Sequence, residues 1–161
     1  MTRELILMRH AHARLADPGQ LDHARSLSPR GCVQAHAAGR WLMKQSLVPD
    51  RILCSPARRA RETLAALMAS LGENQPLFEE NIYQASIQSL ITLLEAHVEA
   101  KRVLLIGHNP GLEQLCRLLC HQQQILPVVW SISPSSLVVL TLSAKADTMV
   151  GTADLKIIWK P

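Results

Sequence analysis

Three short apolar runs in the chain end abruptly on polar or charged residues. The runs have the length and content of buried strands, and they are Leu5–Met8, Ile52–Cys54 and Val103–Ile106. Four residues suited to holding or attacking an anion follow closely on these runs: Arg9, His10, Arg59 and His108. Because the carboxyl ends of parallel strands line up along one edge of an open sheet, we expect the four side chains to converge there.

The segments between the runs carry apolar residues at spacings of three and four, which is typical of helices with one buried face. This pattern predicts helices from Pro29 to about Gln45, from Pro56 to Leu71, from Ser86 to Val98 and from Pro110 to Leu119. Ser28, Ser55 and Asn109 each precede a proline, a pairing favoured at helix starts. The expected inward faces are Val33, Ala37 and Trp41; Ala57, Ala60, Leu64, Leu67 and Leu71; Ile87, Leu90, Ile91, Leu94 and Val98; and Leu112, Leu115, Cys116 and Leu119.

Polar segments predict the connections. Residues 11–27, with a turn at Asp17–Gly19, form a surface loop beside the candidate site, and residues 72–85 form a linker whose short strand contains Glu79–Tyr83. A further polar connection, at residues 122–134, is kept from forming a helix by its prolines.

The order of the predicted elements indicates the class of fold. Two late apolar runs, Leu137–Leu142 and Leu155–Trp159, predict a hairpin. Strands that alternate with helices predict a three-layer α/β domain. With 161 residues the chain is large enough for one core and too small for two, so residues 1–161 are expected to form a single domain.

Composition narrows the classes of partner. The formal charge of +4 suits an anionic ligand, but only 3% of the residues are aromatic, so side chains that could stack on bases are scarce. A phosphorylated substrate is therefore favoured over nucleic acid. The sequence contains no apolar run of about 18 residues and no signal segment before the first strand, which predicts a cytoplasmic protein without a membrane partner.

Metal binding is disfavoured by the positions of the potential ligands. The four cysteines lack paired spacing and are interpreted as buried free thiols: Cys32, Cys54, Cys116 and Cys120. A zinc site built from His10, His12 and His108 is conceivable, but the arginines nearby would repel the cation. The remaining histidines are interpreted as structural or surface residues, with His12 the nearest to the site.

Two arginines and two histidines are suited to phosphoryl transfer. Arginine is always charged and its planar fork fits phosphate oxygens, so Arg9 and Arg59 would bind the phosphoryl group. His108 precedes a predicted helix N-terminus, where an anion is already favoured. A neutral imidazole can attack phosphorus when a hydrogen bond, commonly to a backbone carbonyl, orients its other nitrogen; this makes His10 the candidate nucleophile.

Each of these residues also has an ordinary structural interpretation. A single histidine at a strand end is more often structural than catalytic, but the coincidence at three strand ends favours a site. Arg58, Arg59 and Arg61 lie in the first turns of a predicted helix, where the dipole disfavours cations by ~0.3–1 kcal/mol each. A bound anion would offset that cost, although Arg58 or Arg61 individually is equally interpretable as a solvated surface charge.

Three motifs, in this order and at these intervals, resemble those of the histidine phosphatase superfamily: Leu7–Ala11, Ser55–Thr63 and Gly107–Pro110. The short chain is similar to the SixA branch of phosphohistidine phosphatases, and the likeness covers nearly its whole length. The resemblance implies an α/β/α sandwich of the phosphoglycerate mutase-like type, with a mixed, mostly parallel sheet. It also implies that neither a metal nor an organic cofactor is used.

The resemblance further implies roles for the site residues. His10 becomes the transiently phosphorylated nucleophile, and Arg9, Arg59 and His108 become the phosphate pocket. The second arginine of the family lies four residues after the serine of the Ser-Pro motif, which selects Arg59 over Arg58.

The general acid is predicted less directly. Larger members of the superfamily use an acidic residue after the second helix, and Glu80 is the nearest positional match; Glu79 and Glu80 are equally interpretable as a solvated edge. An alkoxide leaves poorly unless it is protonated, whereas a phosphorylated imidazole can carry the proton on its own second nitrogen, since imidazole titrates near pKa ~6.5. A weak general acid is therefore compatible with phosphohistidine hydrolysis.

The sequence thus favours a phosphatase that moves a phosphoryl group from phosphohistidine in a partner protein to His10 and then to water. A histidine-containing phosphotransfer domain is one such partner, and the short loops of the chain would leave the pocket open to a protein side chain. A phosphatase for a small phosphorylated metabolite is an alternative. A noncatalytic phosphoprotein-binding module is another, although it would have no need of an in-line nucleophile.

Overall fold

The structure, a computed structural model, describes residues 2–72, 74–121, 131–143 and 149–161. Its helices and strands are, in order, β1 (Thr2–Arg9), α1 (Pro29–Lys44), β2 (Arg51–Cys54), α2 (Arg58–Leu71), β3 (Leu77–Phe78), α3 (Ile87–Glu95), β4 (Arg102–Gly107), α4 (Gly111–Leu119), β5 (Leu137–Ser143) and β6 (Ala153–Trp159). Two short 3-10 helices lie in the connections, η1 (Asp22–Ala24) and η2 (Glu80–Ile82). Within the described residues, every helix is too short or too polar to cross a lipid bilayer.

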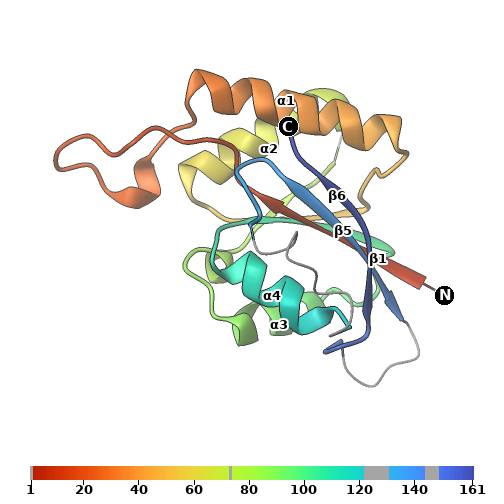
Figure 1. The fold of residues 1–161 in the computed structure, drawn as a ribbon. Coiled ribbons are helices and arrows are strands. Elements are labelled where there is room, and N and C mark those ends of the chain that lie inside the picture. Colours follow the sequence, from red (N-terminus) through yellow and green to blue (C-terminus); the bar gives the residue numbers. More distant parts are fainter. Residues whose placement is uncertain (1, 73, 122–130, 144–148) are drawn as a thin grey trace.

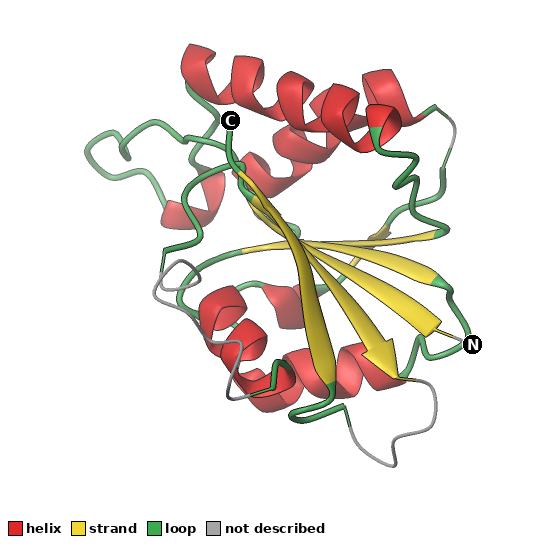
Figure 2. Cartoon of the chain, turned by 45° about the vertical axis from the view of Figure 1, so that its right-hand side comes forward, coloured by secondary structure: helices red, strands yellow, loops and turns green. Residues whose placement is uncertain are grey.

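The strands form one mixed sheet in the order β3-β2-β4-β1-β5-β6. The four strands from β3 to β1 are parallel, whereas β5 runs antiparallel to β1 and pairs with β6 as the predicted hairpin. Helices α1 and α2 cover one face of the sheet, and α3 and α4 cover the other (Figures 1 and 2). The predicted three-layer α/β class and its mostly parallel mixed sheet are confirmed.

The apolar runs are continuous because the central strands are buried on both faces. In β1, Leu5 and Leu7 pack into the core beneath α3 and α4, while Ile6 and Met8 pack into the core beneath α1 and α2. All four side chains are fully or almost fully buried. Because successive side chains of a strand point to opposite faces of the sheet, a single run of residues contributes to both cores.

Of the three predicted caps that precede a proline, one is confirmed and two are wrong, while the predicted start at Ser86 is confirmed. The Ser28 side chain accepts a hydrogen bond from the amide of Gly31 and caps α1. By contrast, α2 begins at Arg58 and α4 has Pro110 at its N-cap. The side chain of Asn109 donates instead to the Glu113 carboxylate and to a backbone carbonyl, so its polar group is used by tertiary partners rather than by the helix end.

The predicted inward face of α1 is only partly correct: Trp41 is half-buried and packs against the core, whereas Val33 points into solvent. Val33 is 68% exposed, and the buried face is formed by residues such as Ala38 and Leu42. The reason is the close approach of α2: a Cβ added at Gly39 would lie 3.0 Å from the carbonyl oxygen of Leu67. Small residues therefore face α2, and the larger apolar side chain of Val33 is left in solvent.

The other differences concern α3, the linker and one cysteine. Helix α3 ends at Glu95, so Val98 lies beyond it and is exposed. The linker strand is β3, upstream of the predicted segment Glu79–Tyr83, most of which forms η2. Cys32 is exposed, whereas the other three cysteines are buried and free as expected. Most of the predicted polar connection, residues 122–130, lies outside the described residues.

The start of α1 packs directly against the segment that follows β1. A Cβ at Gly31 would lie 2.1 Å from the carbonyl oxygen of His12, which also accepts a hydrogen bond from the amide of Ser28. Backbone atoms held in this way cannot move aside cheaply. Glycine at this position is therefore required by the packing of α1 and not by the backbone conformation of the helix.

We expect Gly31→Ala to lower the free energy of unfolding by at least ~2 kcal/mol, measured by urea denaturation. Helix propensity alone would favour alanine by ~1 kcal/mol, so the sign of the change reports the steric contact. The control is Arg40→Ala, at an exposed position of the same helix, which should change stability little. A Gly31→Ala protein as stable as the parent would contradict this account of the packing.

Candidate active site

The sheet places the two candidate histidines side by side. His10 follows β1 and His108 follows β4, and these strands are parallel neighbours with Arg9 opposite Gly107 in the register. The two ring centroids are 5.1 Å apart. Arg59, the second residue of α2, reaches both rings, so the predicted convergence of these three side chains is confirmed.

The hydrogen bonds of His10 define its tautomer. Its Nδ1 lies 2.8 Å from the carbonyl oxygen of Ala11, which can only accept, so Nδ1 carries the proton. The lone pair of Nε2 then faces Arg59, whose Nε donates to it over 3.2 Å. Burial, together with the charges of Arg59 and Arg9, lowers the pKa of His10 to about 4. The ring is therefore neutral at pH 7 and presents an unprotonated nitrogen to the pocket.

His108 is neutral for similar reasons. Burial, the neighbouring His10 and the charge of Arg59 lower its pKa to about 3. Its Nδ1 lies 3.4 Å from Nη2 of Arg59, and a guanidinium can only donate, so Nδ1 is the acceptor. Its Nε2 then carries the proton and donates to the Ser55 hydroxyl over 2.7 Å. Ser55 thus orients His108, and its hydroxyl also accepts a hydrogen bond from the amide of Ala57 over 3.3 Å; Ala57, and not Ser55 as predicted, is the N-cap residue of α2.

Arg59 is held at its outer end by a residue that the sequence did not indicate. The residue is only 6% exposed, and its Nε and Nη2 face the two imidazoles. Its Nη1 donates to the backbone oxygen of Asp22 over 2.7 Å, and Nη2 donates to the Asp22 carboxylate over 3.0 Å. Asp22 therefore fixes the plane of the guanidinium, and the side edge of the guanidinium, formed by Nε and Nη2, faces the histidines.

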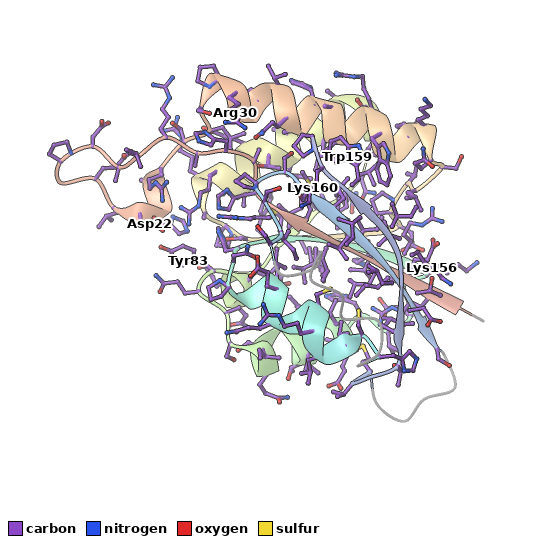
Figure 3. All side chains as sticks on the ribbon, in the orientation of Figure 1. Asp22, Arg30, Tyr83, Lys156, Trp159 and Lys160 are labelled. Carbon is purple, nitrogen blue, oxygen red and sulfur yellow. The ribbon has the colours of Figure 1, made fainter. Side chains whose placement is uncertain are left out.

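Asp22 belongs to a small network at the mouth of the site. Its carboxylate also accepts hydrogen bonds from Arg25 and from the hydroxyl of Tyr83, at 2.9 Å each. The Arg25 hydrogen bond first, and then those of Tyr83 and Arg59, hold the pKa of Asp22 well below its usual range. Figure 3 shows Asp22 and Tyr83 together at one edge of the molecule, although they come from different connections.

The loop that carries Asp22 is fixed at both ends to α2. The amide of Ala11 donates to the Thr63 hydroxyl over 3.0 Å, and that hydroxyl donates to the carbonyl of Arg59. At the other end, the amide of Leu27 donates to the Glu62 carboxylate over 2.6 Å. Two consecutive residues of α2 therefore position both the loop and, through it, the carboxylate that holds Arg59.

Arg9 lies close enough to His10 for its charge to lower the pKa of that ring. Its Nη1 donates to the carbonyl of Ile132 over 3.0 Å, while its buried Nε has no hydrogen-bond partner among the described residues. Burial lowers the pKa of this guanidinium. A buried cationic donor without a hydrogen-bond partner is suited to binding an oxyanion.

Glu80, the predicted general acid, is not brought into contact with these residues. It is exposed at the start of η2, and within the described parts of the chain its side chain makes no hydrogen bond or ion pair with the four candidate residues. A cavity of about 400 Å³ beside the site is instead lined by Asp22, Arg59, Tyr83 and His108 among other residues. The role of Glu80 stays a prediction.

Two features of this site escaped sequence reasoning. The loop at 11–27 was expected beside the site, but its periodicity and spacing gave no reason to single out Asp22. Tyr83 was assigned to a short strand. An acidic residue in a loop next to three predicted cations was the one available signal.

No group of three or more His, Cys, Asp or Glu side chains in the described ranges is arranged to hold a metal ion.

Comparison with known proteins places the chain in a family. Residues 5–84 match the model of the histidine phosphatase superfamily, branch 1. An uncharacterised protein of Mycobacterium tuberculosis is 36% identical over 114 residues, which cover 70% of this chain and 69% of that protein. The chain therefore belongs to the histidine phosphatase superfamily, and it is a phosphatase.

Within the superfamily the chain is similar to SixA proteins. The phosphohistidine phosphatase SixA of Escherichia coli is 29% identical over 123 residues, covering 73% of this chain and 74% of that protein. The structure of a candidate phosphohistidine phosphatase SixA from Nakamurella multipartitia is also 29% identical. It superposes with a TM-score of 0.86 and covers 100% of this chain and 97% of that one.

The electrostatics of the pocket can be tested directly. Because the charge of Arg59 lowers the pKa of both His10 and His108, we expect Arg59→Gln to raise both values, measured by NMR titration of the ring Cε1–Hε1 signals. Arg59→Lys, which keeps a charge, should raise them less. Arg40→Gln removes an exposed charge from α1 and should leave both titrations in place. Unchanged titrations in a folded Arg59→Gln protein would show that Arg59 does not set these pKa values.

Proposed function

We propose that the protein hydrolyses phosphohistidine in a partner protein and that His10 carries the phosphoryl group between the substrate and water. The observation that carries this proposal is the tautomer of His10: Nδ1 is bound to the Ala11 carbonyl, and the Nε2 lone pair points at Arg59, where a phosphoryl group would be held. The depressed pKa keeps that lone pair available at neutral pH.

The other groups support the same reaction. The side edge of Arg59 would bind the equatorial oxygens of the phosphoryl group, and the free Nε of Arg9 would bind another. An anion beside His108 would raise its pKa, so that a ring that is neutral in the empty pocket could gain a proton and donate to the bound oxyanion. The pocket thus combines cationic donors with an uncharged nucleophile.

The chemical steps balance without a cofactor. The Nε2–P bond of His10 forms as the N–P bond of the substrate breaks, and the substrate imidazole leaves as a neutral ring because its second nitrogen already carries a proton. Water then attacks phosphorus as the Nε2–P bond breaks. The two protons of the water leave with the phosphate, and His10 returns to the neutral ring that carries its proton on Nδ1. Since Asp22 is held ionised by its three donors, it is an orienting group rather than the proton donor in this scheme.

The similarity to proteins named phosphohistidine phosphatase SixA supports a phosphohistidine substrate over a small phosphorylated metabolite. It also supports the predicted partner class, such as a histidine-containing phosphotransfer domain. We further propose that the protein acts in the cytoplasm.

The proposal is tested with two substrates, a phosphotransfer domain phosphorylated on histidine and p-nitrophenyl phosphate. We expect kcat/KM to be higher for the phosphodomain and a trapped phosphoryl group to map to His10. His10→Ala should lower kcat by at least ~1,000-fold, because it removes the nucleophile. His36→Ala, at an exposed position of α1, is the matched control and should keep full activity.

Two results would overturn this proposal. Label on a residue other than His10 would exclude the mechanism. A higher kcat/KM for small phosphate esters than for phosphodomains would instead favour the small-metabolite alternative.

A further inference from the structure

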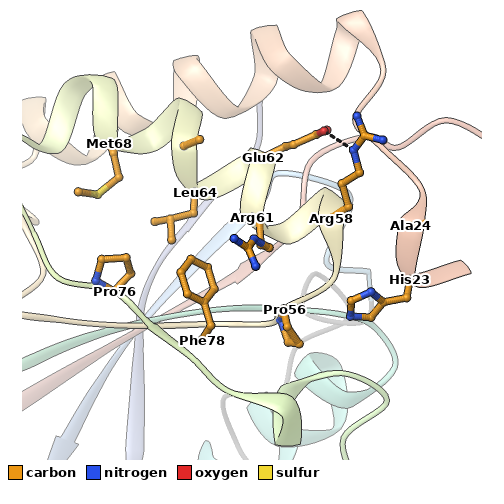
Figure 4. Close-up of a pocket in the computed structure, with 11 residues that line it drawn as sticks. His23, Ala24, Pro56, Arg58, Arg61, Glu62, Leu64, Met68, Pro76 and Phe78 are labelled. Atoms are coloured by element: carbon orange, nitrogen blue, oxygen red, sulfur yellow. Dashed lines mark hydrogen bonds and ion pairs between the residues drawn. The ribbon is translucent and has the colours of Figure 1, made fainter.

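An open groove lies next to the active site, on the other side of η1. It has a volume of about 690 Å³ and is separate from the cavity that Asp22, Arg59 and His108 line. Residues of η1 divide the two spaces, because Asp22 lines the cavity while His23 and Ala24 line the groove. Figure 4 shows the groove extending from His23 along one side of α2.

The floor of the groove is apolar and partly exposed. Leu64 and Met68 of α2 face Pro76 and Phe78 across it (Figure 4). Phe78 is 44% exposed, which is unusual for a large aromatic side chain at the edge of a sheet. Exposed apolar residues gathered in a concave surface are typical of a binding site for another protein.

A cation without a carboxylate partner stands over this floor. The guanidinium of Arg61 lies 4.7 Å from the centre of the Phe78 ring, and in the described parts of the chain no carboxylate lies within ion-pair distance of it. Glu62, the nearest acidic residue in sequence, is engaged by Arg58 at 2.7 Å and by the amide of Leu27. The positive charge of Arg61 is therefore available to an external anion.

We propose that this groove docks the protein that carries the phosphohistidine, by receiving an apolar side chain flanked by carboxylates. The inference rests on the proposed function and deepens it by defining the substrate as an acidic protein surface. Charge complementarity selects this occupant: Arg61 offers an unneutralised cation over an apolar floor, and the whole chain carries a formal charge of +4.

The position of the groove fits this occupant. A phosphohistidine that enters the pocket at Arg59 brings the surface around it over η1, and the groove begins there at His23 and Ala24. A small phosphorylated metabolite held by Arg59 would leave the far end of the groove, at Met68 and Pro76, unused. The groove should therefore affect protein substrates and leave small ones unaffected.

The test compares a phosphotransfer domain phosphorylated on histidine, chosen with acidic residues around that histidine, with p-nitrophenyl phosphate. Arg61→Glu should raise KM for the phosphodomain about tenfold with little change in kcat. Turnover of p-nitrophenyl phosphate should stay within about twofold, because Arg61 lies outside the phosphate pocket. Met68→Gln, which makes the floor polar, should act in the same direction. Arg40→Glu makes the same charge reversal on α1, away from the groove, and should leave both substrates unaffected.

Ionic strength gives a second readout. The parent should lose affinity for the phosphodomain as salt is raised, and Arg61→Ala should reduce that dependence. An active parent whose groove variants hydrolyse the phosphodomain normally would overturn the docking surface alone. Equal losses on both substrates would also overturn it, since they would assign the groove residues to the chemistry. A parent inactive on phosphohistidine would overturn the proposed function and this inference together.

Discussion

The site depends on one buried cation, the guanidinium of Arg59. A charge that is 6% exposed is costly unless its donors are paired, and here each nitrogen has a partner. Two imidazole nitrogens lie along its side edge, and Asp22 meets its end. These contacts link His10, His108 and Asp22 through a single guanidinium. Burial first, and the charge of this cation in addition, lower the pKa of both histidines and keep them uncharged.

This arrangement leaves the pocket positively charged while its two imidazoles stay neutral. Two neutral imidazoles 5.1 Å apart can share a small buried space, whereas two imidazolium ions beside two arginines would repel one another. The positive charge is thus concentrated on the guanidinium groups, where it is permanent. The nitrogen proposed as the nucleophile, Nε2 of His10, needs no base to deprotonate it, because the ring proton lies on Nδ1, which donates to the Ala11 carbonyl.

The scaffold contributes precision through a few short contacts. Parallel pairing of β1 with β4 fixes the spacing of the two histidines, and Thr63 and Glu62 tie the 11–27 loop to the helix that carries Arg59. The groove at Arg61 lies on the same helix. The proposed phosphate binding, the loop position and the proposed docking surface are therefore all coupled to α2.

The sequence alone determined the class of fold and the convergence of three side chains at the site, those of His10, Arg59 and His108. Apolar runs that end on Arg9–His10 and on His108 identify strands buried on both faces and the edge at which they stop, because burial and strand length leave a direct pattern in the residues. The resemblance to the histidine phosphatase superfamily selected Arg59, which lies four residues after the serine of the Ser-Pro motif. Such patterns are local, so they can be recognised in a short segment of the sequence.

Tertiary structure decided which polar groups these residues meet. Asp22 and Tyr83 are far from Arg59 in the sequence, and only the path of two connections brings them together. Ser55 had the sequence context of a helix cap, yet its hydroxyl is taken by His108, which approaches from another strand. The inward face of α1 likewise depended on how closely α2 approaches at Gly39. These hydrogen-bond partners and buried faces depend on the distances between helices, strands and loops that are far apart in the sequence, and a local sequence pattern does not contain those distances.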